Sequence, residues 1–127
     1  MRRGLLALIF IFAGLMPAFA DSAAVQTVLY FGLSRPDGGQ VEDAQWRDFL
    51  ARDVTPRFPE GLTVIDGYGQ WRDAQVQPVT ERTKLVIIVH PASESAARSL
   101  REIKAIYVKR FNQISVMQTD QDVRVVE

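Results

Sequence analysis

Cationic, amide and aromatic side chains recur in this sequence at positions where they could hold a small ligand. Guanidinium groups form paired hydrogen bonds with anions, and aromatic rings stack on planar groups. Tyr107 and Arg110 lie three residues apart in a predicted helix, so they share a face. The sequence therefore predicts a site for a small anionic or planar ligand, with these candidate residues: Arg57, Gln70, Trp71, Arg82, Tyr107, Arg110 and Gln113.

A structural role is the alternative for most of these candidates. Tyr107 and Trp71 are large enough to fill a core, and Arg57 and Arg110 could brace the corners between helix and strand. Trp71 is expected to be mostly buried, because a buried indole contributes a large apolar area and usually has its N–H bonded. Arg57 is expected to be partly buried and paired with a carboxylate or a strand-end carbonyl.

Arg82 follows Glu81 directly, just before a strongly apolar strand. Neighbours in a strand point to opposite faces of a sheet, so only one of the two can face a given cavity. Arg82 is the candidate for the ligand site. A structural ion pair with Asp66 or Asp73 is an equal alternative.

The sequence carries no catalytic signature. It contains no cysteine, which excludes disulfides, thiol nucleophiles and cysteine-based metal sites. His90 is the only histidine and has no carboxylate at ligand spacing, so a structural role before Pro91 is favoured over metal or haem ligation. No serine has the context of a nucleophile elbow. We therefore expect no metal and no cofactor, and the catalytic residues, if any, stay unknown.

The elements that must position these residues alternate as β-α-β-β-α-β. Runs of β-branched and aromatic residues predict strands, and apolar residues at i, i+3 and i+4 predict helices. The predicted strands are 27–33, 62–66, 83–89 and 114–118, the last resuming at 123–126, and the predicted helices are 43–53 and 93–111. This order predicts a ferredoxin-like α+β domain, with both helices on one face of a four-stranded antiparallel sheet of order 4-1-3-2.

The stretch 54–72 organises the rest of the chain. Pro56 and Pro59 fix two φ angles and favour extended conformations at Thr55 and Phe58, the residues that precede them. A strand follows, and Gly67 and Gly69 permit a bulge or bend before the aromatic and polar residues at its end.

The two predicted central strands have apolar residues at both odd and even positions, and so on both faces of the sheet. Two helices can cover only one of these faces. An exposed apolar face of several hundred Å2 is rare in a monomer. The sequence therefore predicts a homodimer that pairs sheet against sheet. A covering segment from the ends of the chain is the alternative.

The first 20 residues have the pattern of a secretory signal peptide. Arg2 and Arg3 precede an apolar run over 5–16, and an A-x-A site ends at Ala20, so cleavage is expected before Asp21. An uncleaved anchor is the alternative, but the apolar run is shorter than the ~20 residues of a membrane span. We expect a single periplasmic or secreted bacterial domain over 21–127, with no stable membrane insertion after cleavage. The net charge of +0 argues against a nucleic-acid partner.

Several blocks together resemble a bacterial exported family called domain of unknown function 3574. They are TVLYFGLSRPDGG, W-x-x-F-L, VTPRFPEGLTVIDGYGQW, ERTK and Y-x-x-R-F-x-Q-x-S-V, and they span Thr27 to about Met117. The resemblance implies a small exported domain without an assigned activity. We expect a domain that binds a small ligand or a partner protein and self-associates through its sheet. The alternative is a cofactor-independent enzyme of the dimeric α+β barrel type, a small monooxygenase or isomerase, by analogy of fold.

Overall fold

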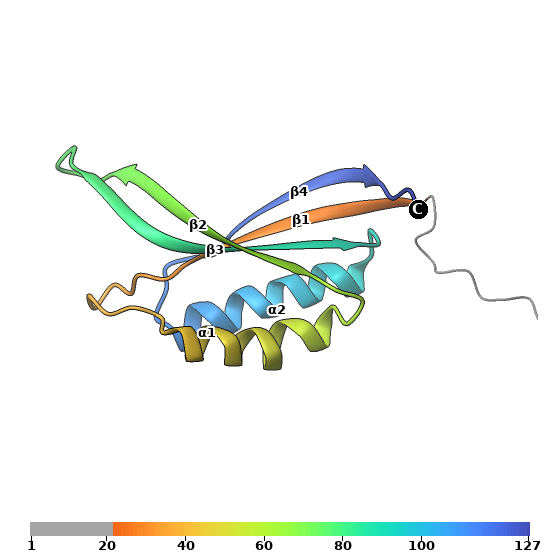
Figure 1. Ribbon diagram of the computed structural model, residues 1–127, viewed down its shortest axis with the longest axis horizontal. Coiled ribbons are helices and arrows are strands. Elements are labelled where there is room, and N and C mark those ends of the chain that lie inside the picture. Colours follow the sequence, from red (N-terminus) through yellow and green to blue (C-terminus); the bar gives the residue numbers. More distant parts are fainter. Residues whose placement is uncertain (1–21) are drawn as a thin grey trace, which may run out of the picture.

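The computed structural model describes residues 22–127, and the predicted signal peptide lies outside this range. The chain folds into one four-stranded sheet with its helices on one face (Figure 1). The elements are β1 (Ala23–Gly32), α1 (Asp43–Phe49), β2 (Thr63–Arg72), β3 (Pro78–His90), α2 (Glu94–Arg110) and β4 (Met117–Arg124). The predicted ferredoxin-like α+β fold is confirmed.

The sheet has the strand order β2-β3-β1-β4, and every neighbouring pair is antiparallel. This is the predicted order 4-1-3-2, with the two most apolar strands in the centre. In one row of the sheet, Tyr30 of β1 lies beside Leu85 of β3 and Met117 of β4. Since side chains alternate along a strand, these three residues share the face opposite the helices. We call this the open face.

The core lies between the helices and the other face of the sheet. Its centre is a cluster of aromatic rings in edge and tilted contact, with Phe31 of β1 only 4.7 Å from Tyr107 and 5.5 Å from Phe49, centroid to centroid. Tyr107 is fully buried, and its hydroxyl donates a hydrogen bond to the Gly32 carbonyl at 2.6 Å. Tyr107 therefore fills the core, which was the structural alternative to its predicted role in ligand binding.

The segment after α1 differs from the sequence-based prediction. The chain continues through a single wide turn (Leu50–Val54) into a 3₁₀ turn (Thr55–Arg57). Thr55 is helical, with φ −55° and ψ −42°, so the predicted extended conformation is wrong there. Its N–H donates to the Leu50 carbonyl, and Pro56 sits in the first turn of the 3₁₀ helix, where it requires no N–H bond.

Ser93 caps the start of helix α2. The Ser93 hydroxyl accepts a hydrogen bond from the Ala96 N–H at 3.1 Å. The helix buries a stripe of residues against the sheet: Ala96, Leu100, Ile103 and Tyr107. It is followed by Asn112, which has a positive φ of 51° and turns the chain toward β4.

Strands β1, β2 and β3 extend beyond their predicted limits, whereas β4 begins later than predicted. β2 and β3 are 10 and 13 residues long and form a hairpin that projects past the helices (Figure 1). β4 begins at Met117 instead of at the predicted Ile114, which is 92% exposed. The sequence signal is weak here because β4 is an edge strand with polar residues on both faces. Within residues 22–127, no helix has the length and apolar character needed to cross a membrane.

Candidate binding pocket on the open sheet face

A concave pocket of about 570 Å3 lies on the open face, where the hairpin leaves the body of the sheet. Its volume falls in the range of about 300–1,000 Å3 that is typical of small-molecule sites. All four strands or their adjoining loops contribute to it. The lining residues are Tyr30, Gly32, Gly67, Tyr68, Gly69, Gln70, Trp71, Glu81, Thr83, Leu85, Gln113, Ser115 and Met117.

Glycines create the hollow. In the register of the sheet, Gly32 and Gly67 flank Thr83, and Gly69 lies beside Glu81, so all three glycines belong to the open face. A Cβ atom on Gly67 would lie only 2.5 Å from Leu85 Cδ1, and a Cβ on Gly32 would lie 2.7 Å from Glu81 Oε1. The missing side chains therefore leave room both for a ligand and for the Glu81 carboxylate.

Glu81 supplies the charge of the pocket. Its side chain lies over Gly32, and Oε2 accepts a hydrogen bond from the Ser34 N–H at 3.2 Å. Within the described part of the chain, Glu81 forms no ion pair. The carboxylate is also close enough to the core to add to the effect of burial in raising the pKa of Tyr107. A half-buried carboxylate without a cationic partner is the feature that a cationic ligand would satisfy.

Apolar and aromatic side chains form the walls around this carboxylate. Tyr30 rises from the centre of the sheet, Trp71 from the hairpin and Met117 from the start of β4. Trp71 is 47% exposed and Met117 57% exposed. The expectation that Trp71 is mostly buried is therefore wrong, because its side chain lies on the open face, which the helices do not cover.

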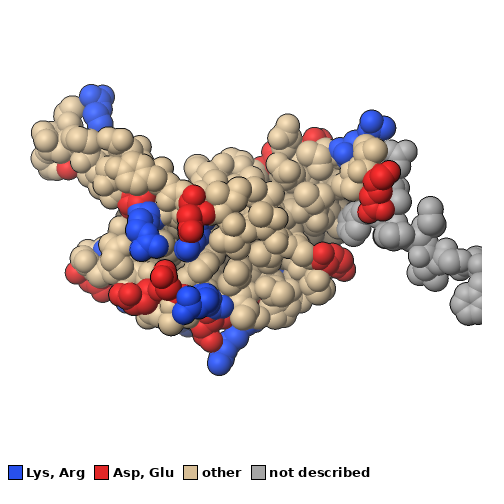
Figure 2. Space-filling view, in the orientation of Figure 1, with Lys and Arg blue, Asp and Glu red and all other residues tan. Residues whose placement is uncertain are grey.

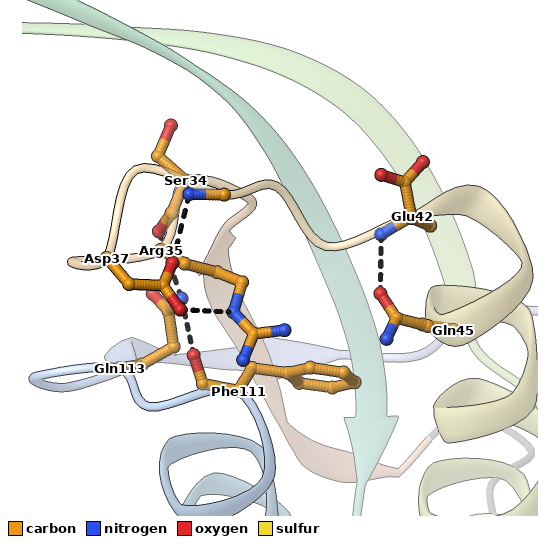
Figure 3. Close-up of polar contacts among 8 residues, drawn as sticks. Ser34, Arg35, Asp37, Glu42, Gln45, Phe111 and Gln113 are labelled. Carbon is orange, nitrogen blue, oxygen red and sulfur yellow. Dashed lines mark hydrogen bonds and ion pairs between the residues drawn. The ribbon is translucent and has the colours of Figure 1, made fainter.

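The rim of the pocket is fixed by contacts between the loop after β1 and the turn after α2. Gln113 Nε2 donates to the Ser34 carbonyl at 3.0 Å and to the Phe111 carbonyl at 3.3 Å (Figure 3). At the other end of the same loop, Gln45 Oε1 accepts a hydrogen bond from the Glu42 N–H at 2.9 Å, which fixes the start of α1. Gln113 thus lines the pocket while its amide nitrogen holds the Ser34 segment in place.

The predicted ligand residues are divided between two regions. Trp71 and Gln113 meet at the pocket, and Gln70 borders it from β2, although its side chain alternates to the other face of the sheet. The other candidates, Arg57, Arg82, Tyr107 and Arg110, lie on the helix side of the sheet or in the core. Glu81 and Arg82 are adjacent in β3, and Glu81 is the one whose side chain faces the pocket.

Each of these arginines has a carboxylate partner near the helices. Arg57 Nε lies 3.1 Å from Glu102 Oε2 in α2, and Arg57 Nη1 donates to the Asp53 carbonyl at 2.8 Å, so Arg57 is paired with a carboxylate as expected but joins helical segments. Arg110 Nη1 lies 2.7 Å from Asp53 Oδ2.

Arg82 takes neither of its two predicted partners as an ion pair. Arg82 Nη2 lies 3.7 Å from Asp43 Oδ1, while Asp66 pairs with Lys84. The hydrogen bond from Lys84 and the charge of Lys84 lower the pKa of Asp66, and the charge of Arg82 adds a smaller effect.

His90 joins three strands on the helix side of the sheet. It is 6% exposed, and its Nε2 lies 2.7 Å from the hydroxyl of Thr27, which in turn donates to Asp120 Oδ1 at 2.7 Å. Its Nδ1 lies 2.8 Å from the Pro91 carbonyl. Both ring nitrogens are therefore occupied by protein groups, which matches the structural role. Among residues 22–127 there is no cluster of three or more histidine, aspartate and glutamate side chains that could hold a metal.

Sequence reasoning did not select Tyr30, Glu81 or Met117. Once the register is known, the alternation of side chains along each strand shows that these three residues share the open face. Alternation alone could not show that three glycines would lie beside them.

A family model for a protein of unknown function, DUF3574, matches residues 26–126. The chain belongs to this family. The match covers almost all of the described structure, in agreement with the resemblance found in the sequence. No curated protein sequence gives a significant match.

Two solved structures have a similar fold, and both are of a phage SAM lyase. The structure in complex with S-methyl-5′-thioadenosine has a TM-score of 0.63 and 14% sequence identity, and the alignment covers 91% of this chain and 97% of the lyase chain. The apo structure has a TM-score of 0.60 and 16% identity, with 90% and 97% covered. At this identity the likeness shows a shared fold.

Proposed function

We propose that this DUF3574 protein binds a small ligand that combines a positive charge with a planar or apolar group, in the pocket on the open face. The observation that carries the proposal is the Glu81 carboxylate, which has no ion-pair partner in residues 22–127 and lies among Tyr30, Trp71 and Met117. Aromatic faces attract cations and stack on planar rings, and the carboxylate adds a full charge. The predicted anionic ligand is not favoured here, because the arginines that suggested it already pair with carboxylates.

The fold likeness supports a nucleoside sulfonium as the first ligand to test. One of the similar structures is in complex with S-methyl-5′-thioadenosine, which has a planar base and an apolar thioether. S-Adenosylmethionine has the same nucleoside and carries its positive charge on sulfur. That compound would place a planar ring against the aromatic wall and a cation near Glu81.

Calorimetric titration with S-adenosylmethionine and with S-methyl-5′-thioadenosine tests the proposal. We expect Glu81→Gln to weaken binding of the sulfonium by about 10-fold or more, since a charge-assisted contact contributes roughly 1.5–3 kcal/mol. Binding of the neutral thioether should change little. Trp71→Ala should weaken both compounds.

The matched control is Glu60→Gln, which removes an exposed carboxylate from the turn before β2. It should leave both affinities unchanged. If neither compound binds, or if Glu81→Gln binds the sulfonium as well as the parent does, the proposed ligand class is wrong.

A second candidate function is a lyase that acts on the same sulfonium. Its support is the fold shared with the phage SAM lyase, while the monooxygenase or isomerase expected from fold analogy stays a prediction. Incubation with S-adenosylmethionine followed by mass spectrometry tests it. A lyase would break the bond between the sulfonium sulfur and the four-carbon amino-acid chain, with the electron pair kept by sulfur, so S-methyl-5′-thioadenosine should form together with an equal amount of the four-carbon fragment. Loss of both products in Glu81→Gln would favour the lyase, and recovery of unchanged ligand would favour a binding domain.

We further propose that the domain acts outside the cytoplasm. The support is the signal-peptide pattern of residues 1–20 in the sequence. Intact-mass measurement of the protein recovered from the periplasm or medium should show a chain that begins at Asp21. A chain that retains residues 1–20 would contradict cleavage.

A further inference from the structure

The open face of the sheet is almost free of charge. In the register of the four strands, its outward positions carry one charged side chain, that of Glu81, and this one lies recessed in the pocket. In the view of Figure 2, most of the charged side chains lie over the helices and at the two ends of the sheet. Asp66, Arg82 and Lys84, which belong to the same strands, all point to the helix side.

Large apolar side chains occupy this face instead. Ile65, Trp71, Val89 and Met117 are 41–57% exposed, and they come from three different strands. Val28, Leu85 and Ile87 lie between them in the middle of the sheet. No described segment of the chain covers these residues. A continuous apolar surface of this kind marks a site of protein association.

We propose that the open face pairs with the open face of a second copy of this chain, and that the second copy closes the pocket. An uncharged face favours such a partner, because a partner with surface charges would have to bury them unpaired. A second copy brings the same neutral surface and only its own recessed Glu81. Self-complementary pairing about a two-fold axis uses one patch on both subunits.

The size and shape of the face suit this partner. Strands about 4.8 Å apart, with about 3.3 Å per residue over the 8 residues of β4, give a face of roughly 20 by 26 Å. Two such faces bury about 1,000 Å2, which reaches the lower limit of a specific interface before the projecting hairpin is added. A twisted sheet is saddle-shaped, and packing at roughly 90° is one of the two ways in which sheets stack.

The pairing rests on the sheet face alone, and only the closing of the pocket rests on the proposed function. The pocket is bounded by the sheet floor, the hairpin and the segment before β4, and its remaining side is open to solvent. A partner sheet laid across Tyr30 and Met117 would complete that side. It would also exclude water from around Glu81, which strengthens a contact with a cationic ligand.

Sedimentation velocity between about 1 and 100 μM tests the pairing, on protein whose N-terminus has been read by intact mass. We expect a species of at least twice the chain mass. Ile65→Lys places a charge beside Leu85, on the β2 side of the face, and should weaken association at least 10-fold. Thr119→Lys changes an exposed polar residue of the same face on β4 and should do the same without loss of folding.

The matched control is Ala105→Lys, which adds the same charge to an exposed position of α2 on the opposite side of the molecule. It should associate as the parent does. A monomer throughout the range overturns the proposal, and so does an oligomer that Ile65→Lys and Thr119→Lys leave intact. A monomer that still binds S-adenosylmethionine overturns the pairing and leaves the ligand site standing.

Discussion

The hydroxyl of Tyr107 links the core of the protein to the rim of the pocket. It donates to the carbonyl of Gly32, the residue over which the Glu81 carboxylate lies. Burial raises the pKa of Tyr107, and the nearby Glu81 raises it further. The hydroxyl therefore stays neutral and keeps its proton in this bond across the physiological range. Its role is to position the end of β1 beneath Glu81.

Tyr107→Phe tests this role at the scale of one atom. The ring keeps its contacts with Phe31 and Phe49, so the loss should be that of one buried hydrogen bond, about 1 kcal/mol in the free energy of unfolding. Denaturant titration measures it. Tyr68→Phe, at a side chain that is 71% exposed, is the control and should be neutral. A Tyr107→Phe protein as stable as the parent would show that the bond contributes nothing.

Asp120 gives the stability a dependence on pH. The hydrogen bond from Thr27 lowers its pKa, more than burial raises it. A depressed pKa in the folded state means that ionised Asp120 stabilises the protein above its unfolded pKa of ~3.9, and that this contribution is lost as the pH falls through the folded value.

We therefore expect the parent to be more stable than Asp120→Asn at pH 5, with a difference that shrinks as the pH falls toward 2. The difference is small because Asp120 is exposed and screened. Unfolding midpoints along this series measure it, and Asp122→Asn, an exposed neighbour on the same face of β4, controls for removal of a negative charge. A constant difference between parent and Asp120→Asn would contradict the assignment.

At the scale of elements, β2 shows how a strand can form a cavity where glycines take the place of larger side chains on one face. Gly67 and Gly69 both face the open side, but their surroundings differ. An added Cβ would lie 2.5 Å from Leu85 Cδ1 at Gly67 and 3.4 Å from Thr83 Oγ1 at Gly69. Neither glycine has a positive φ, so the need for glycine here is one of space and not of backbone conformation.

Gly67→Ala should therefore destabilise the protein by about 1–3 kcal/mol, as overpacking does, because Leu85 must shift. Gly69→Ala should be neutral or slightly stabilising, since alanine restricts the unfolded chain. Thermal unfolding of the two variants side by side measures the difference. Equal melting temperatures would show that Leu85 moves aside at no cost.

The same scale explains what could be predicted from the sequence. Strands β1 and β3 were recognisable because they are buried between two layers and read as continuous apolar runs. The end of β2 and most of β4 were not, since a hairpin arm and an edge strand carry polar and glycine residues without a clear period. The conformation of Thr55 was mispredicted because the helix before it outweighed the local preference of a residue before proline.

At the scale of the whole molecule, the candidate site depends on register more than on residue type. Trp71 and Gln113 were selected from the sequence because their types suit binding, and both line the pocket. The arginines were selected for the same reason and brace the helices instead. Glu81 and Tyr30 were missed, because only the pairing of strands far apart in sequence brings a carboxylate, glycines and an aromatic ring together.

The hairpin has a consequence for motion. Beyond the pair Gly32–Thr83, the strands β2 and β3 continue to Arg72 and Pro78 with no third strand beside them. A two-stranded ribbon without a packed face is marginally stable by itself, so this arm should open locally far more often than the centre of the sheet. Its amide protons at 69–72 should exchange with solvent well before those of β1. Since Trp71 belongs to the arm, the wall of the pocket can adjust to what it holds, and slower exchange at these amides would be a direct sign that the pocket is filled.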